Sequence, residues 1–409
     1  MAVTNTKTTL ASRLKEQYNS GISQLVPVVN FLRRSIEFKS ILSPGELARF
    51  DVQMALENGF SVGAAGSDFS LNPSIAQESV KAEVDGCGIL LRSRVAYGLI
   101  TAAQSKKQAF ATFNDKKFIP MVESFSRREE LLTLVGRQGL GVVDSNTSGV
   151  LKITEKSWNP TRWIGLKGAV LEAFTAISGG SQHNTDLVIT NIDIAAREIT
   201  VSGTSAAVVQ NDILFFKGHR GVEPIGLMHI ARNTGTLYGI NAANYELWKA
   251  SKYDVGTSGL TLGKILEAAA NAGDKGCAEK LVCLVPLKAF QGLVSDEAAL
   301  VRHDAQKRKA ENGFEYLSFY GATGEIEIVP YHNMEDGSFL MYPPRWVSYI
   351  GSTEVVPQVG TSGDIYFDVS DSAAKEMRLF AEWTVFCERP GYIVWGERSD
   401  GKALHADAS

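Results

Sequence analysis

The most regular hydrophobic pattern in the chain runs from Lys106 to Val135. Its apolar residues recur near the i, i+3, i+4, i+7 spacing of one helix face: Phe110, Phe113, Phe118, Met121, Val122, Phe125, Leu132 and Val135. The other face is charged, with Lys116, Lys117, Glu123, Arg127, Arg128, Glu129 and Glu130. Thirty helical residues make a rod of roughly 45 Å, which predicts a spine on which other layers rest. Pro120 should kink or divide this rod, and Gly136 and Gly139 should end it.

The segment before this helix has two textures. Residues 59–88 are rich in glycine, serine, asparagine and aspartate, which is typical of turns and loops. Residues 88–100 alternate in the manner of an extended strand, with Leu91, Ser93, Val95 and Tyr97 on one face. A long two-stranded excursion is marginally stable by itself in water, so it needs a surface to lie on, of this chain or of a neighbour.

After the helix the pattern becomes rich in β-strands and then mixed. Residues 141–225 contain short strand patterns at 186–194, 197–203 and 211–216. An apolar helix face follows, with Thr261 as its N-cap and Gly273 as its end. Strands are expected at 280–285, where Pro286 then opens a helix, and also at 324–330, 383–388 and 391–395. No internal repeat and no low-complexity segment occurs.

Charge is unevenly distributed along the chain. The 409 residues carry 41 Lys and Arg against 45 Asp and Glu, a formal charge of −4, which argues against non-specific binding to nucleic acid or anionic membranes. Residues 1–42 nevertheless hold six basic and two acidic residues, a net charge of +4. Such asymmetry suggests an arm that lies on an acidic neighbour or an acidic polymer. Leu10, Leu14 and Tyr18 fit one helical face, so a surface helix with solvated charges is the alternative.

Other compositional features narrow the class of protein. A hydrophobic fraction of 44% is ample for packed cores. No apolar run approaches the roughly 18 residues of a membrane span, and the polar N-terminus is not a secretory signal. Four cysteines in so long a chain do not make a disulfide framework. These features predict a multi-part protein of a reducing compartment without a membrane partner.

Local signatures of chemistry are missing. Cys277 and Cys283 lack the spacing of zinc ligands, and the histidines at 183, 219, 229, 303, 332 and 405 are scattered. The stretch from Gly259 to Lys264 has one residue too few between its glycines for a phosphate-binding loop, and Gly63–Gly66 has no strand before it. No nucleophile elbow of a serine hydrolase occurs, and Cys283 fits a buried apolar strand better than a reactive thiol. Glu325 and Glu327 share one face of a strand, but a chain with 45 acidic residues contains such pairs by coincidence. We therefore predict no catalytic, cofactor-binding or metal-binding residue, and a structural role.

The order of these features resembles that of the major capsid proteins of tailed bacteriophages, which share the Hong Kong 97-type fold, an α+β fold. Several segments are similar to that family in their amino-acid sequence as well as in their order. They are 81–86 leading to 95–98, 225–228 with 236–240, 309–315 with 324–330, and 386–390. None is a catalytic signature, so the specificity lies in their collinearity over nearly the whole chain.

The resemblance implies a division of the chain. Residues 1–58 are expected to form an N-terminal arm and 59–105 an extended loop that overlaps the adjacent subunit. Residues 106–225 are expected to form a peripheral domain, with the spine helix at about 106–140 and an enlarged or inserted β element at about 150–220. Residues 226–352 correspond to an axial domain, and 353–409 to strands that return to the peripheral domain.

The resemblance also implies function and partners. The chain is expected to self-assemble into hexamers and pentamers of an icosahedral virion shell around double-stranded DNA, with no enzymatic activity and no cofactor. Assembly would take place in the cytoplasm of a host bacterium. No long charged coiled segment precedes the arm, so either a separate scaffolding protein or a scaffolding domain already removed is expected. The other expected partners are a portal complex and decoration proteins, and the DNA on the inner face is bound non-specifically if at all. Some relatives cross-link a loop lysine to a neighbouring asparagine, but no partner for Lys81 can be assigned, so this bond is not predicted.

Two alternatives stay open. The first keeps the fold and changes the role, giving a bacterial nanocompartment shell that encloses a cargo protein, although such shells usually lack a long arm. The second is a two-domain enzyme whose site is assembled from residues far apart in sequence, which would need a deep pocket with strongly perturbed ionisable groups.

Overall fold

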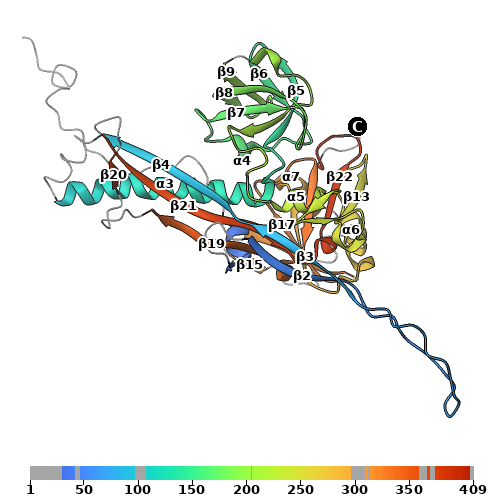
Figure 1. Cartoon of the computed structure of the whole chain (residues 1–409). Coiled ribbons are helices and arrows are strands. Elements are labelled where there is room, and N and C mark those ends of the chain that lie inside the picture. Colours follow the sequence, from blue (N-terminus) through green and yellow to red (C-terminus); the bar gives the residue numbers. More distant parts are fainter. Residues whose placement is uncertain are drawn as a thin grey trace, which may run out of the picture.

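The computed structural model describes residues 30–41, 47–96, 107–203, 205–295, 309–311, 314–321, 323–358, 366–368 and 374–405. A helix and a sheet of long strands form its elongated part (Figure 1). The helix is α3 (Lys107–Val135) and the sheet, here called the spine sheet, contains β1 (Glu37–Ser40), β4 (Cys87–Ala96), β19 (Val347–Pro357), β20 (Tyr366–Asp368) and β21 (Ala374–Cys387). β21 lies in its middle, pairing with β4 along one edge and with β19 and β20, at different positions, along the other.

The predicted spine helix is confirmed at nearly the expected bounds. It is one helix of 29 residues, so Pro120 does not divide it. Met121, Phe125, Leu132 and Val135 are buried, as the periodicity indicates. The helix ends just before Gly136, which lies against Gly226. No side chain fits at position 136, because a Cβ there would come within 2.2 Å of the carbonyl oxygen of Pro224.

A closed barrel of six strands follows the helix and stands apart from the spine sheet (Figure 1). Its strands run in the order β10-β5-β6-β9-β8-β7, all antiparallel to their neighbours. Closure leaves no unpaired edge, and the interior is filled by buried aliphatic side chains such as Val143, Leu171 and Leu214. The bounds are β5 (Gly141–Thr147), β6 (Val150–Ile153), β7 (Val170–Phe174), β8 (Gln182–Asp193), β9 (Glu198–Ser202) and β10 (Ile213–Phe216), with α4 (Pro160–Trp163) and η1 (Ser205–Ala207) between them.

The third part is a seven-stranded mixed sheet with helices on it. Its order is β13-β22-β18-β14-β17-β16-β15, and β13 with β22 and β14 with β17 are the parallel pairs. The strands are β13 (Ser251–Gly256), β14 (Leu281–Val285), β15 (Lys309–Glu311), β16 (Phe314–Gly321), β17 (Gly324–Pro330), β18 (Ser338–Tyr342) and β22 (Val394–Arg398). The helices are α5 (Leu227–Arg232), α6 (Leu262–Asp274) and α7 (Leu287–Ser295). Thr261 caps α6 as predicted, its Oγ1 accepting from the Lys264 N–H at 3.4 Å.

A hairpin of β2 (Leu47–Ala55) and β3 (Glu78–Asp85) leaves the body and ends in a long tip, residues 56–77 (Figure 1). The remaining short elements are α1 (Phe31–Ser35), β11 (Thr236–Leu237), β12 (Ile240–Asn241), η2 (Glu246–Trp248), η3 (Pro344–Trp346) and η4 (Pro390–Tyr392).

Three expectations about boundaries are corrected. The expected boundary at residue 58 falls between β2 and β3, but these two strands pair with each other. The glycine-rich stretch forms the tip of their hairpin and does not mark the beginning of the excursion. The extended stretch from Gly88 is β4, a strand of the spine sheet, and not an arm of the excursion. β22 was expected to lie in the same part of the fold as β19 and β21. It lies instead between β13 and β18 of the seven-stranded sheet.

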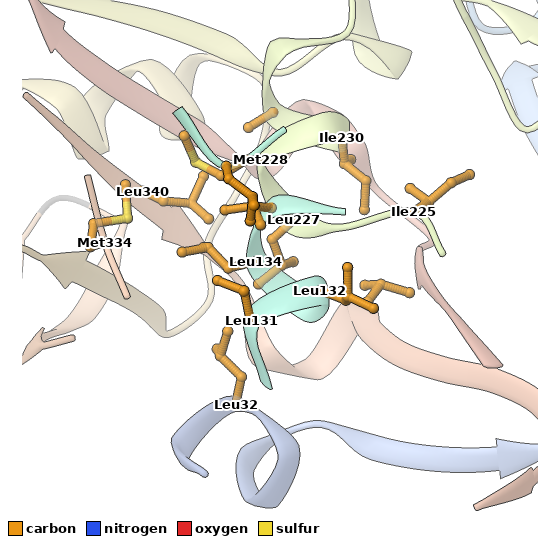
Figure 2. Packing of buried hydrophobic residues seen from close by; sticks show 14 of the residues in the cluster. Leu32, Leu131, Leu132, Leu134, Ile225, Leu227, Met228, Ile230, Met334 and Leu340 are labelled. Atoms are coloured by element: carbon orange, nitrogen blue, oxygen red, sulfur yellow. The ribbon is translucent and has the colours of Figure 1, made fainter. Parts of the chain in front are cut away.

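One core joins the elongated part to the seven-stranded sheet. Figure 2 shows Leu131, Leu132 and Leu134 at the end of α3, between Leu32 of α1 on one side and Leu227 and Met228 of α5 on the other. Met334 and Leu340, from the region of β18, reach the same cluster. The spine helix is therefore fixed at its C-terminal end, where both sheets meet.

Candidate subunit-contact surfaces

The root of the hairpin is anchored by aromatic side chains. Phe50 of β2 stacks on Phe386 of β21, with ring centroids 4.5 Å apart and planes inclined by 19°. Tyr238 meets the same ring edge-on at 5.0 Å, and its hydroxyl donates to the Val385 carbonyl at 2.8 Å. On the other strand, the Glu83 N–H donates to the Tyr238 carbonyl at 2.8 Å. These contacts hold the base of the hairpin on β21.

The tip of the hairpin has the opposite character. Its large apolar side chains are between 46% and 92% exposed: Leu56, Phe60, Val62, Phe69, Leu71 and Ile75. Hydrogen bonds give the tip a defined path, since Asn58 N–H donates to the Ile75 carbonyl at 3.1 Å and the Asn72 side-chain amide to the Phe60 carbonyl at 2.8 Å. An ordered, projecting and exposed apolar segment marks an interaction surface, because water contact with so much apolar area is unfavourable.

The chain enters the body through α1, and a buried carboxylate holds it there. Glu130 of α3 accepts hydrogen bonds from the N–H groups of Leu32 and Arg33 at 2.8 and 2.9 Å. The Tyr331 hydroxyl donates to the same carboxylate at 2.7 Å. α1 has no side-chain cap of its own, so Glu130 supplies the acceptor that the first turn lacks.

The neighbouring Glu129 ties the same helix to the spine sheet. It accepts from the indole N–H of Trp383 at 2.9 Å, and the Arg33 guanidinium lies 3.8 Å away. Burial raises the pKa of Glu129 to about 7, against the opposing effect of Arg33 and Trp383. Burial also raises the pKa of Glu130, although the hydrogen bonds that its carboxylate accepts favour the ionised form. This acidic pair is thus a structural junction of α1, α3 and β21.

Two solved structures resemble this chain over nearly its full length. The capsid asymmetric unit of Cyanophage A-1(L) has a TM-score of 0.54 at 10% sequence identity, covering 98% of this chain and 100% of its own. The capsid of the native GTA particle has a TM-score of 0.53 at 7% identity, covering 97% and 99%. The chain has the Hong Kong 97-type capsid fold. The predicted α+β class and fold are thereby confirmed.

Weaker likenesses add nothing to this conclusion. The holo-SrpI encapsulin complex from Synechococcus elongatus PCC 7942 covers 100% of this chain and 99% of its own at 7% identity, but its TM-score of 0.46 is too low to carry an argument. No protein-family model matches the sequence, and no curated protein is similar to it in sequence.

Within this capsid fold, the residues that the sequence singled out have structural contacts. Lys264 donates to Ser258 and to the Gly259 carbonyl at 2.9 Å, so its side chain stabilises the loop that precedes α6. Cys283 is buried in β14, and burial raises the pKa of its thiol. Glu325 accepts from Ser318 at 2.8 Å, whereas Glu327 pairs with Lys280. Gly63 and Gly66 lie in the tip of the hairpin.

The scattered histidines and the remaining cysteines do not converge. His183 contacts Asp212 at 2.8 Å, His219 contacts Glu223 at 3.2 Å, and His229 contacts Gln138 at 3.0 Å. Burial raises the pKa of Cys87 to about 11. His303 and the arm before residue 30 lie outside the described residues. In the part of the chain that the structure describes, no cluster of potential metal ligands occurs and no helix is long and apolar enough to cross a membrane.

Sequence reasoning missed the acidic junction of the capsid fold. Glu129 and Glu130 were placed on the charged face of the spine helix, yet both are buried, at 1% and 0% exposure. The available signal was their position, because both precede Leu131 and Leu132 in the last two turns, where the helix packs on two sides. Similarly, the alternation of β2 marked a strand before the glycine-rich tip.

Proposed function

We propose that this protein is the major capsid protein of a tailed phage, which self-assembles into the hexamers and pentamers of an icosahedral shell around double-stranded DNA. The exposed apolar tip of the hairpin carries the proposal, together with the likeness of the fold to two capsid structures. The role is structural and not catalytic, and the working form is the assembly within the virion.

The exposed tip of the hairpin needs a second copy of this chain to cover it. A projecting segment with six large exposed apolar side chains gains stability when a sister subunit covers it. Contacts of this head-to-tail type close into rings when the rotation permits, which gives hexamers and pentamers. Simultaneous contacts by several such segments multiply the effect of each one.

The parts of the fold take corresponding roles. The hairpin with its tip, residues 47–85, is the extended loop, and the chain before it is the N-terminal arm. The spine helix and spine sheet make the peripheral domain, with the barrel as an inserted element, and the seven-stranded sheet makes the axial domain. A separate scaffolding protein, a portal complex and decoration proteins are the further partners, with DNA held loosely on the inner face because the net charge is −4.

The decisive experiment is electron microscopy of the full-length chain under conditions that favour assembly. We expect closed shells from the native chain. Replacing two exposed tip residues, Phe60→Ser with Leu71→Ser, should leave folded subunits that do not form shells, because exposed positions contribute little to the stability of the single chain.

A matched control and the content of the particles complete the test. Ile194→Ser changes an apolar residue of the barrel that is 48% exposed, and it should leave assembly intact. Monodisperse native subunits at high concentration, or shells from the tip variant, would contradict the proposal. Particles formed in cells that hold a cargo protein in place of DNA would favour the nanocompartment alternative.

A further inference from the structure

A groove of about 490 Å³ runs beside β2 at the base of the hairpin. Five consecutive residues of this strand, 50–54, line the groove. Successive side chains of a strand point to opposite faces, so a run of five lining residues means that β2 borders the groove with its backbone edge. The opposite wall contains Leu247 of η2, Trp346 of η3, and Arg389 and Tyr392 at η4.

The edge of β2 that borders this groove is unpaired. Among the described strands, β2 pairs with β3 alone, and β3 contributes no described residue to the lining of the groove. The groove therefore lies along the other edge of β2. This strand has nine residues, so its free edge offers a row of backbone donors and acceptors. An extended peptide can add to such an edge as a further strand.

The groove also offers apolar surface. Phe50, Val52 and Met54 are half-buried along one face of β2. Leu247, on the opposite wall, is 58% exposed. A strand added here gains backbone hydrogen bonds and covers apolar side chains at the same time, and both effects contribute to the affinity of strand addition.

The charge of the hairpin favours a basic partner. Residues 47–85 contain six acidic and two basic residues, a net charge of −4. The acidic residues of the stem are exposed: Asp51, Glu78, Glu83 and Asp85. Residues 1–29 of the chain contain three basic residues and one acidic residue, a net charge of +2. Opposite charges steer two surfaces together and fix which partner binds, so the arm complements the hairpin.

The arm also contains a stretch whose composition suits a strand. Five of the seven residues from Val3 to Thr9 are β-branched, which favours strands, and Lys7 gives the stretch a positive charge. The twenty residues that follow, 10–29, span at most roughly 70 Å when extended. This length exceeds the roughly 44 Å of α3. Residues 3–9 can therefore reach an adjacent subunit.

The arm joins the body on the face of the spine sheet away from the groove. It enters through α1, whose N–H groups donate to Glu130 of α3 at 2.8 and 2.9 Å. α3 lies on the face of β21 that carries Trp383, because the indole N–H of Trp383 donates to Glu129 of that helix. Phe386, three positions later, points to the opposite face and borders the groove. The arm of an adjacent copy is thus better placed for this groove than the chain's own arm.

We propose that the N-terminal arm of one subunit docks in this groove of an adjacent subunit, with residues 3–9 adding as a strand to the free edge of β2. The basic arm then lies on the acidic stem of the hairpin and holds its base from the side opposite to β3. This inference rests on the proposed assembly, because the arm and the groove belong to different copies of the chain.

Photochemical cross-linking in assembled shells tests this contact. Full-length chains labelled with nitrogen-15 carry a photoreactive residue in the arm, Val3→benzoylphenylalanine, and a large excess of unlabelled native chains is added before assembly. After illumination, mass spectrometry identifies the peptide that is joined to the arm. We expect labelled arm peptides joined to unlabelled peptides that contain residues 50–54.

Two matched variants separate the groove from other exposed surfaces. Leu247→Lys should lower the cross-link yield in assembled shells about fivefold or more, because apolar contact is lost and the basic arm is repelled. Val222→Lys changes an apolar residue of similar exposure, 61%, that does not line the groove, and should leave the yield unchanged. Both positions are exposed, so neither change should unfold the chain.

The outcomes distinguish this inference from the proposed function. Shells whose arms cross-link outside residues 50–54, or only within labelled chains, would overturn the inference and leave the proposed function intact. Equal yields from Leu247→Lys and Val222→Lys would overturn it as well. Native chains that form no shells would contradict the proposed function, and the inference would fail with it.

Discussion

Phe50 and Phe386 lie stacked with their ring centroids 4.5 Å apart, and this pair connects the projecting hairpin to the longest strand of the spine sheet. Phe386 is buried, whereas Phe50 is half-buried at the base of the hairpin. The pair therefore determines the direction in which an otherwise weakly supported excursion leaves the body.

Truncating this contact should loosen the hairpin without unfolding the body. We expect Phe50→Ala to lower the free energy of unfolding by roughly 1–3 kcal/mol, less than for a fully buried phenylalanine. Hydrogen exchange should speed up in β2 and β3 and stay unchanged in β14. Val52→Ala on the same face is the control, with a smaller effect. Unchanged exchange in the hairpin of Phe50→Ala would show that the stack is not its anchor.

The contact of Gly136 with Gly226 should tolerate no side chain. A Cβ on Gly136 meets backbone oxygens at 2.2 and 2.6 Å, so Gly136→Ala must displace the end of α3. We expect a loss of about 2 kcal/mol or more in denaturant unfolding, typical of overpacking against backbone. Gly263→Ala, in the first turn of α6, places its Cβ at an ordinary contact distance of 3.9 Å from Thr261 Oγ1 and should instead stabilise by about 0.5–1 kcal/mol through helix propensity. Equal effects of the two changes would contradict this account.

Removing the carboxylate of Glu130 should detach α1 from the spine helix. Glu130→Ala leaves two N–H groups of α1 and the Tyr331 hydroxyl without their acceptor. We expect a loss of roughly 3 kcal/mol or more, because several buried donors become unsatisfied. Limited proteolysis should then cleave near residues 30–41. The conservative Glu130→Gln keeps an acceptor and should recover part of the stability, and failure to do so would point to a role for the charge itself.

Stability should respond to pH in two opposite ways. The pKa of Glu129 is raised to about 7, so between about pH 4.5 and 7 the folded chain keeps a proton that the unfolded chain has lost. Its contribution to stability therefore falls as pH rises through this window, by roughly 3 kcal/mol at most. Glu129→Gln should flatten the decline in a series of urea unfolding curves, and an unchanged slope would contradict the assignment.

Glu335 should act in the opposite direction. Burial disfavours its charge, but Arg232 and Arg162 outweigh burial and lower its pKa to about 2. Its contribution to stability is fully present above about pH 4.5 and is lost as pH falls toward 2. Glu335→Gln should lose stability at pH 7 and show a weaker acid transition below pH 4.5. A variant that is as stable as the native chain at pH 7 would contradict this.

The sequence by itself determined the elements whose pattern is local. The 3.6-residue period placed α3, the cap and stop signals placed α6, and alternation or apolar runs placed β9, β10, β14 and β17, because these patterns follow from which face of each element is buried. The order of those elements also carried the resemblance to the capsid fold. The unusual length of α3 correctly indicated a spine.

Only the tertiary structure decided which partners the elements take. β4 has the alternation of a hairpin arm, but it pairs along its whole length with β21, and strand pairing depends on residues nearly 300 positions away. β22 joins the seven-stranded sheet by the same kind of long-range choice. Glu129, Glu130 and Arg162 carry charges that usually mark a solvated face, and they are buried because donors or acceptors from distant segments meet them there. Local pattern fixes which face of an element is apolar, whereas burial of polar groups depends on contacts that form only when the chain is folded.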